Sequence, residues 1–192
     1  MEILYKPIKH WYAKIDDEGK LHIVIPTRLK NNEWFKDALI DKAEKLLTRY
    51  RKKEHIQTMD EKTVLIFWEK VAKKEIAENA KKIPPALKKI LEEYALPILK
   101  EYSEKLGFKF AVANKLTIRT TKSKRWSCTV DQNISLNLSL VHLPTKYIRY
   151  VIIHEICHLK IKNHSPKFRN QVANFCPNYK LIRKEMKKMI LK

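Results

Sequence analysis

The chain has 192 residues, 44% of them hydrophobic, so it is long and apolar enough to bury the core of one domain or slightly more. Its 41 Lys and Arg residues against 21 Asp and Glu residues give a formal net charge of +20, which favours polyanionic partners such as nucleic acid or acidic proteins. Three cysteines without a Cys-x-x-Cys pair argue against a disulfide framework, and the lack of a recognisable membrane span or signal peptide leads us to expect a cytoplasmic protein.

The first part of the chain is predicted to form a β-hairpin. Two alternating segments, Tyr5–Ile15 and Leu21–Pro26, flank the turn-rich residues 16–19. Period-two alternation places every second side chain on the same face of a strand. One face of the second strand should therefore be apolar, formed by Leu21, Ile23 and Ile25.

A helix is predicted next. Asn31 or Asn32 is a suitable N-cap, and the helix should run to about Arg51. Apolar residues recur at helical spacing and predict the buried stripe. These residues are Phe35, Leu39, Leu46 and Tyr50.

The middle of the chain is predicted to be mainly helical. The segment Asp60–Lys82 reads as a helix, although Val64–Phe67 alone is compatible with a strand. The two prolines that follow should end it. A further helix is expected over Ala86–Leu106, stopped by Gly107.

The pattern changes to alternation in the last part of the chain. Phe108–Ala113 and Lys115–Thr120 read as strands, residues 121–124 as a basic loop, and Ile134–Leu140 as a period-two strand. The unbroken apolar run that follows predicts a helix from Thr145 to about Lys162.

This last helix carries the motif His-Glu-x-x-His, formed by His154, Glu155 and His158. Residues four apart lie one turn apart on the same face of a helix, so the two imidazoles can bind one zinc ion. Glu155 is then placed to take a proton from a zinc-bound water. The same five residues also occur by chance in helices, where such histidines simply pack in the core.

A catalytic zinc site needs a third protein ligand and one open position. The natural candidate is His164, because Ser165 and Pro166 read as the N-cap and first residue of a new helix, and a turn there would bring His164 back to the first two histidines. The spacing equals that of the metzincin pattern, but Ile161 stands where that pattern has glycine. Cys157, inside the motif, is expected to be a small buried residue.

Four groups of residues resemble the YgjP-like metallopeptidase family, whose usual pattern is R-W-G-S-C, N-I-x-L-N, Y-V-V-x-H-E-x-x-H-L and N-H-S-x-x-F. They are Arg125–Cys128, Asn133–Asn137, Tyr150–Leu159 and Asn163–Phe168. The resemblance covers nearly the whole chain and is weakest from about Thr58 to Lys82. It implies a zincin-type fold, a zinc hydrolase classed as a peptidase, and distant similarity to the SprT-like and WLM proteases that cut proteins crosslinked to DNA.

The resemblance also implies roles for four residues: His154, His158 and His164 match the metal ligands of the family, and Glu155 matches its general base. One departure is the missing glycine between Trp126 and Ser127, which leaves the role of this loop open. Cys128 is either an additional metal ligand or, as we favour, a packed cysteine. Several residues are eligible to stabilise the oxyanion, each with an ordinary structural alternative. They are Arg119, Arg125, His142 and Tyr179.

Together these observations predict an α+β fold with a zincin-like core, in which a small antiparallel or mixed sheet packs on the active-site helix beside an N-terminal hairpin and helices. We expect a single domain over residues 1–192, divided into a hairpin and helix (1–57), a helical region (58–107) and a catalytic core (108–192).

The predicted function is that of a zinc-dependent peptidase acting on a protein or peptide substrate, with possible contact to DNA or RNA through the basic surface. The alternative is a basic nucleic-acid-binding protein in which the histidines hold a structural zinc. Lysine-rich surfaces also occur on proteins that bind no nucleic acid. Glu155 discriminates between the two, because a structural site has no use for a general base.

Overall fold

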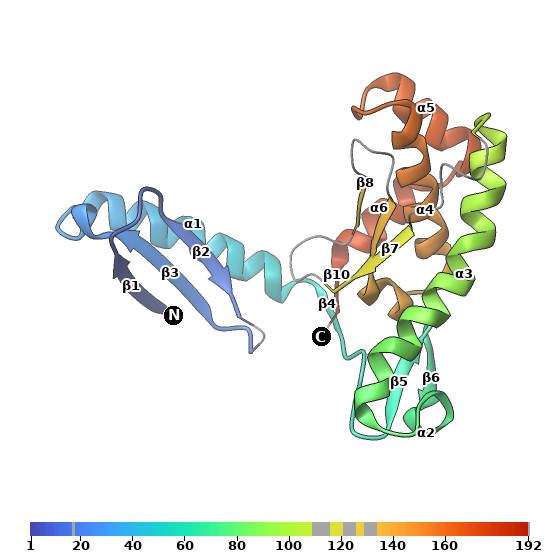
Figure 1. Cartoon of the computed structure of the whole chain (residues 1–192). Coiled ribbons are helices and arrows are strands. Elements are labelled where there is room, and N and C mark those ends of the chain that lie inside the picture. Colours follow the sequence, from blue (N-terminus) through green and yellow to red (C-terminus); the bar gives the residue numbers. More distant parts are fainter. Residues whose placement is uncertain (17, 109–115, 121–125, 129–133, 192) are drawn as a thin grey trace. The chain divides into compact units, whose positions relative to one another are not determined.

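The structure is a computed structural model that describes residues 1–16, 18–108, 116–120, 126–128 and 134–191. The chain forms two compact units, Met1–Ile56 with Lys188–Ile190, and Gln57–Lys187 with Leu191. Both are shown in Figure 1. The single domain that the sequence predicts for residues 1–192 stays a prediction.

The first unit contains a three-stranded sheet of β1 (Glu2–Lys6), β2 (Tyr12–Ile15) and β3 (Leu21–Pro26) in the order β1-β3-β2. The predicted hairpin is confirmed, since β2 pairs antiparallel with β3. However, Tyr5–Ile15 is not one strand, because β1 ends just before Pro7 and pairs parallel with the other edge of β3. Proline has no N–H to donate to a ladder, which explains the break.

Helix α1 (Glu33–Arg51) packs on this sheet. Its N-cap is Asn32, whose side-chain oxygen accepts a hydrogen bond from the backbone N–H of Phe35 at 3.0 Å. The predicted apolar face of β3 is confirmed, and it forms a core with Leu39 and Ala43 of α1. Leu46 does not belong to the buried stripe, because 39% of its surface is exposed. Leu46 lines a hollow together with Ala43 and with Ala13 of β2.

The second unit begins with a β-hairpin where the sequence predicts a helix over Asp60–Lys82. β5 (Thr63–Ile66) pairs antiparallel with β6 (Glu69–Ala72), and only the short α2 (Lys73–Ile76) is α-helical in this part. The helical prediction is wrong, and the strand considered at Val64–Phe67 corresponds to β5.

The turn of this hairpin explains the error. Phe67 and Trp68 have φ angles of 51° and 76°, a conformation usually taken by glycine or asparagine in hairpin turns. Two aromatic residues therefore give no turn signal in the sequence. Contacts made by Phe67 offset the backbone strain: its N–H donates to the carbonyl of Val141 at 2.7 Å, and its ring lies 4.8 Å from that of Tyr94.

Two long helices supply most of the core of the second unit. α3 (Ile83–Lys105) starts three residues earlier than expected because Pro84 and Pro85 occupy its first turn, where no N–H is needed. It packs against α4 (Thr145–Lys160), beside which it runs in Figure 1. Gly107, with φ of 81°, follows the end of α3 as predicted.

A second three-stranded sheet lies next in sequence. It consists of β7 (Leu116–Arg119), β8 (Trp126–Cys128) and β9 (Ile134–Asn137) in the order β7-β9-β8, with β7 parallel and β8 antiparallel to β9. The strand predicted over Ile134–Leu140 is shorter, because Leu138–His142 forms the 3-10 helix η4. The predicted strand over Phe108–Ala113 and the loop over 121–124 lie outside the described residues, apart from Phe108.

Shorter elements complete the fold: η1 (Thr27–Leu29), β4 (Glu54–Ile56), η2 (Ala80–Lys82), α5 (Pro166–Phe175), α6 (Tyr179–Lys188) and β10 (Met189–Leu191). The strands β4 and β10 pair with each other. Within the described ranges no helix has the length and apolarity needed to cross a bilayer. The predicted α+β class is confirmed, with small sheets and helices.

Replacing Leu91 of α3 by alanine is expected to lower the free energy of unfolding by about 2–5 kcal/mol, because a fully buried leucine leaves a cavity. The control Leu96→Ala, on the same helix but 36% exposed, should cost less than about 1 kcal/mol. Urea denaturation followed by circular dichroism measures both, and equal losses would contradict this account of the core.

Candidate metal centre

The helix α4 holds two of the predicted ligands. Its apolar residues face the interior on nearly every side, which is the pattern of a buried helix. His154 and His158 lie one turn apart and are each half-buried. The helix ends at Lys160, two residues earlier than predicted.

The chain then returns His164 to these two histidines. Ile161 has φ of −130° and ψ of 104°, which any residue adopts readily, so the turn does not need the glycine of the metzincin pattern. As predicted, Ser165 caps α5 by accepting a hydrogen bond from the N–H of Phe168 at 3.4 Å, and Pro166 is the first helical residue.

The three imidazoles converge through their Nε2 atoms. The Nε2 atom of His164 lies 3.1 Å from that of His154 and 3.2 Å from that of His158. Zinc binds imidazole nitrogen at about 2.0–2.1 Å, so two ligands of a tetrahedral ion are about 3.3 Å apart. The spacing and chemistry of these nitrogen atoms fit a zinc-type ion.

The hydrogen bond of His158 fixes which of its nitrogens carries a lone pair. Its Nδ1 lies 3.0 Å from the carbonyl oxygen of Ile161, which only accepts, so the neutral ring carries its proton on Nδ1. Its Nε2 lone pair then faces the cluster. A backbone carbonyl of this kind is the usual outer partner that orients a metal-binding histidine.

Burial keeps two of these rings neutral. It lowers the pKa of His154 to about 3, with a further contribution from repulsion by His158 and His164. Burial also lowers the pKa of His158, partly opposed by the bond to Ile161. Near neutral pH both rings therefore offer lone pairs, which a cation requires.

Two aromatic residues support the rings. Phe168 is 2% exposed and touches all three histidines, with its ring centroid 4.3 Å from that of His158 in a stacked arrangement. Tyr150 meets His154 edge-on, with centroids 5.8 Å apart. Reasoning from the sequence gave neither residue this role. The sequence spacing could have indicated this role, because Tyr150 lies four residues before His154 and Phe168 four residues after His164.

Glu155 lies next to His154 and is 1% exposed. Its Oε2 atom is buried and has no hydrogen-bond partner among the described residues. Burial raises the pKa of this carboxyl group to about 8. A buried carboxylate oxygen without a partner is costly, and such groups are found where a ligand or a proton is handled.

The cysteine inside the motif shows no sign of a chemical role. Cys157 is fully buried, as predicted, and burial raises the pKa of its thiol to about 12. For Cys128 the described part is the backbone of β8, so both of its alternatives stay predictions.

The residues considered for oxyanion stabilisation come from different elements. The buried His142 donates through Nδ1 to the carbonyl of Leu65 at 2.7 Å, which is its structural alternative. Tyr179 is buried at the start of α6, Arg119 is exposed at the end of β7, and Arg125 lies outside the described residues.

His164→Ala is expected to weaken zinc binding by more than about 100-fold. Loss of an outer hydrogen-bond partner of a ligand already costs about 10–100-fold, and here a ligand itself is lost. Competition with a chromophoric chelator measures the affinity. The matched control, His10→Ala, removes an exposed histidine of the first unit and should leave the affinity unchanged. Unchanged affinity in His164→Ala would remove this residue from the set of ligands.

Glu155 should make the stability of the metal-free protein depend on pH. An acid whose pKa rises from 4.5 to about 8 on folding stabilises the fold fully below 4.5 and loses this contribution as the pH rises through 8. The free energy of unfolding of Glu155→Gln, relative to that of wild type, should therefore increase as the pH is raised from below 4.5 to above 8. Denaturant titrations with a chelator present measure this, and the exposed Glu104→Gln should show no such trend.

Comparisons with known proteins identify the family of the chain. The chain is similar to the crystal structure of the metallopeptidase zymogen of Pyrococcus abyssi abylysin, with 25% identity over 48% of this chain and 90% of that one and a TM-score of 0.44. No curated protein matches the chain. A sequence model of the YgjP-like metallopeptidase domain matches residues 57–189, more than half of the chain and including all three histidines and Glu155. The chain therefore belongs to the YgjP-like metallopeptidase domain family.

Proposed function

We propose that this protein is a zinc-dependent peptidase in which His154, His158 and His164 hold the ion and Glu155 is the general base. The observation that carries the proposal is the convergence of three Nε2 atoms, two of the distances being 3.1 Å and 3.2 Å, beside a buried carboxyl group. Three histidines leave one position of a tetrahedral ion open for water or substrate, as catalytic zinc requires.

A zinc ion held by these residues would supply Lewis-acid chemistry, acidifying a water molecule and polarising the carbonyl of the scissile bond. Glu155 would accept the proton of the attacking water and pass it to the leaving amine. Its burial excludes competing water, and its lack of a hydrogen-bond partner leaves Oε2 available for this proton. His158 would be held in orientation by Ile161, and all three rings by Phe168.

An extended substrate would bind along β8. This strand is at an edge of the sheet β7-β9-β8 and contacts α4, which carries the histidines. A peptide that adds to an exposed edge strand is held by main-chain hydrogen bonds, largely independent of its sequence. The scissile bond would then lie over the face of α4 that presents His154 and His158.

The alternative function, a basic nucleic-acid-binding protein with a structural zinc, is less well supported. Structural zinc sites are closed by four protein ligands. In the part of the chain that the structure describes, the cluster contains three ligating side chains, of which His164 is exposed. A structural site also gives no reason to bury Glu155 beside it.

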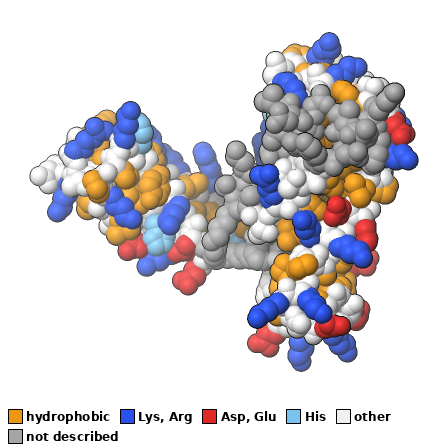
Figure 2. Space-filling view, in the orientation of Figure 1, with side chains coloured by type: hydrophobic (Ala, Val, Ile, Leu, Met, Phe, Trp, Pro, Cys, Tyr) orange, Lys and Arg blue, Asp and Glu red, His pale blue; other side chains and the backbone are white. Residues whose placement is uncertain are grey.

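Contact with nucleic acid stays a prediction, as does the cytoplasmic location. The formal charge of +20 supports such contact through attraction to phosphate. On the face shown in Figure 2, Lys and Arg side chains are spread over each unit among apolar ones and do not form one continuous stripe. Long-range attraction of any polyanion is therefore the expected effect.

Glu155→Gln is expected to retain about one zinc per chain and to lose cleavage of an unfolded protein substrate by at least about a hundredfold, because loss of a general base commonly costs this much. Elemental analysis and a cleavage assay with casein measure the two quantities. Glu104→Gln is the matched control. A Glu155→Gln variant that cleaves like wild type would overturn the role of Glu155, and a wild type without metal would overturn the zinc site.

A further inference from the structure

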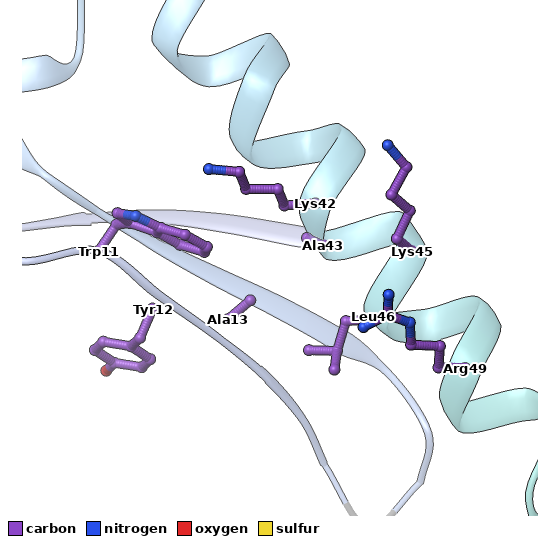
Figure 3. Close-up of a pocket in the computed structure, with 8 residues that line it drawn as sticks. All are labelled: Trp11, Tyr12, Ala13, Lys42, Ala43, Lys45, Leu46 and Arg49. Carbon is purple, nitrogen blue, oxygen red and sulfur yellow. The ribbon is translucent and has the colours of Figure 1, made fainter.

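The first unit contains a cavity of about 380 Å³ between β2 and one flank of α1. It is drawn in Figure 3, where Trp11, Tyr12 and Ala13 come from β2 and the residue before it, and the other lining residues come from α1. These others are Lys42, Ala43, Lys45, Leu46 and Arg49. The cavity lies outside the unit that holds the histidines.

The interior of the cavity is apolar. Ala13 and Ala43 are small, and Leu46 beside them is 39% exposed. Tyr12 points to the other side of β2 and is 45% exposed. Trp11 is half-buried at the same place. Large apolar side chains that line a hollow while partly open to solvent are typical of a binding site.

Three cations stand on the helix side of this cavity. Lys42, Lys45 and Arg49 recur at intervals of three and four residues, so they share one face of α1. Lys45 forms an ion pair with Asp41 at 2.6 Å. Within the described ranges, no carboxylate lies within ion-pair distance of Lys42 or Arg49. The cavity thus presents at least two cations free to meet anionic groups.

The strand beside the cavity has an open edge. In the order β1-β3-β2, the described strands pair with β2 on one side only. A segment added to the outer side of β2 would donate and accept main-chain hydrogen bonds, as in β-augmentation. Every second side chain of that segment would face the flank of α1, where the cavity lies.

We infer that this cavity is a docking site for an extended acidic segment of a protein. The main chain of the segment pairs with the outer edge of β2, its apolar side chains enter the hollow between Trp11 and Leu46, and its carboxylates meet Lys42 and Arg49. A single-stranded nucleic acid would satisfy the cations and stack on the rings but would leave the edge of β2 unpaired. This inference rests on the proposed peptidase function, since it assigns the first unit the capture of acidic protein substrates.

The test measures binding directly. A fluorescein-labelled peptide that repeats two glutamates and two valines, so that each face of the strand carries both kinds of side chain, is titrated with full-length protein carrying Glu155→Gln, in the presence of a chelator, and anisotropy is recorded. A peptide with lysine in place of glutamate and a short oligothymidylate serve as comparison probes. Because cleavage plays no part, failure of this inference is distinguishable from failure of the proposed chemistry.

Two matched variants locate the site. Lys42→Gln with Arg49→Gln removes the two cations of the cavity, and Lys52→Gln with Lys53→Gln removes the same charge from exposed positions just beyond α1. We expect the first pair to weaken binding of the acidic peptide about tenfold or more and the second to change it less than about twofold, because contact pairs matter more than distant charge. Leu46→Asp should weaken the same binding without affecting cleavage of a short neutral peptide.

Two other results would overturn the inference. Equal weakening by both double variants would mean that the net charge of the protein, and not this cavity, attracts the peptide. Tighter binding of oligothymidylate that is lost selectively in Lys42→Gln with Arg49→Gln would assign the cavity to nucleic acid instead.

Discussion

The site depends on one arrangement, the convergence of three imidazole Nε2 atoms on one point. Nitrogen atoms that present lone pairs to one another repel, and a bound cation would remove this repulsion. The protein maintains it by packing: Phe168 contacts every ring, and the carbonyl of Ile161 holds His158 in one tautomer. The energy for this comes from the apolar interior around α4, in which residues such as Ile152 and Ile156 are fully buried. Two of the three histidines of the candidate centre therefore lie on the same helix as much of the core of the second unit.

Glu155 also lowers the stability of the metal-free protein, and core packing must offset this cost. A carboxyl group at this depth lowers the stability of the metal-free fold at neutral and alkaline pH, and nothing among the described residues compensates through Oε2. Core packing elsewhere must offset this cost. An apolar residue would stabilise the helix better at this position, which supports the proposed chemical role of the glutamate. This is the pattern expected of an active site, where local stability is lower than packing would allow.

Much of this could be predicted from the sequence, because the features concerned are local. The four-residue spacing of His154 and His158 follows from helical periodicity, and Ser165 with Pro166 marks a helix start wherever they occur. The hairpin at Phe67 and Trp68 could not be predicted, since its turn is stabilised by the distant Val141 and Tyr94 in place of turn-forming residues. The prediction that Leu46 is buried was wrong for a different reason. Its position fits the helical period, but the residues that line the hollow beside it include the small Ala13 and Ala43. Local rules identify elements and caps, whereas tertiary partners decide such exceptions.

The pairing of β4 with β10 has a consequence for the order in which the chain folds. The first unit is built mostly from the N-terminal residues, but Lys188–Ile190 near the other end of the sequence also belong to it. During synthesis the sheet β1-β3-β2 and α1 can assemble early, whereas β10, the partner of β4 among the described strands, emerges only after α6 has been made. An unpaired strand edge is a place where two nascent chains can associate. The strand β10 thus protects an edge that has been exposed since β4 was made.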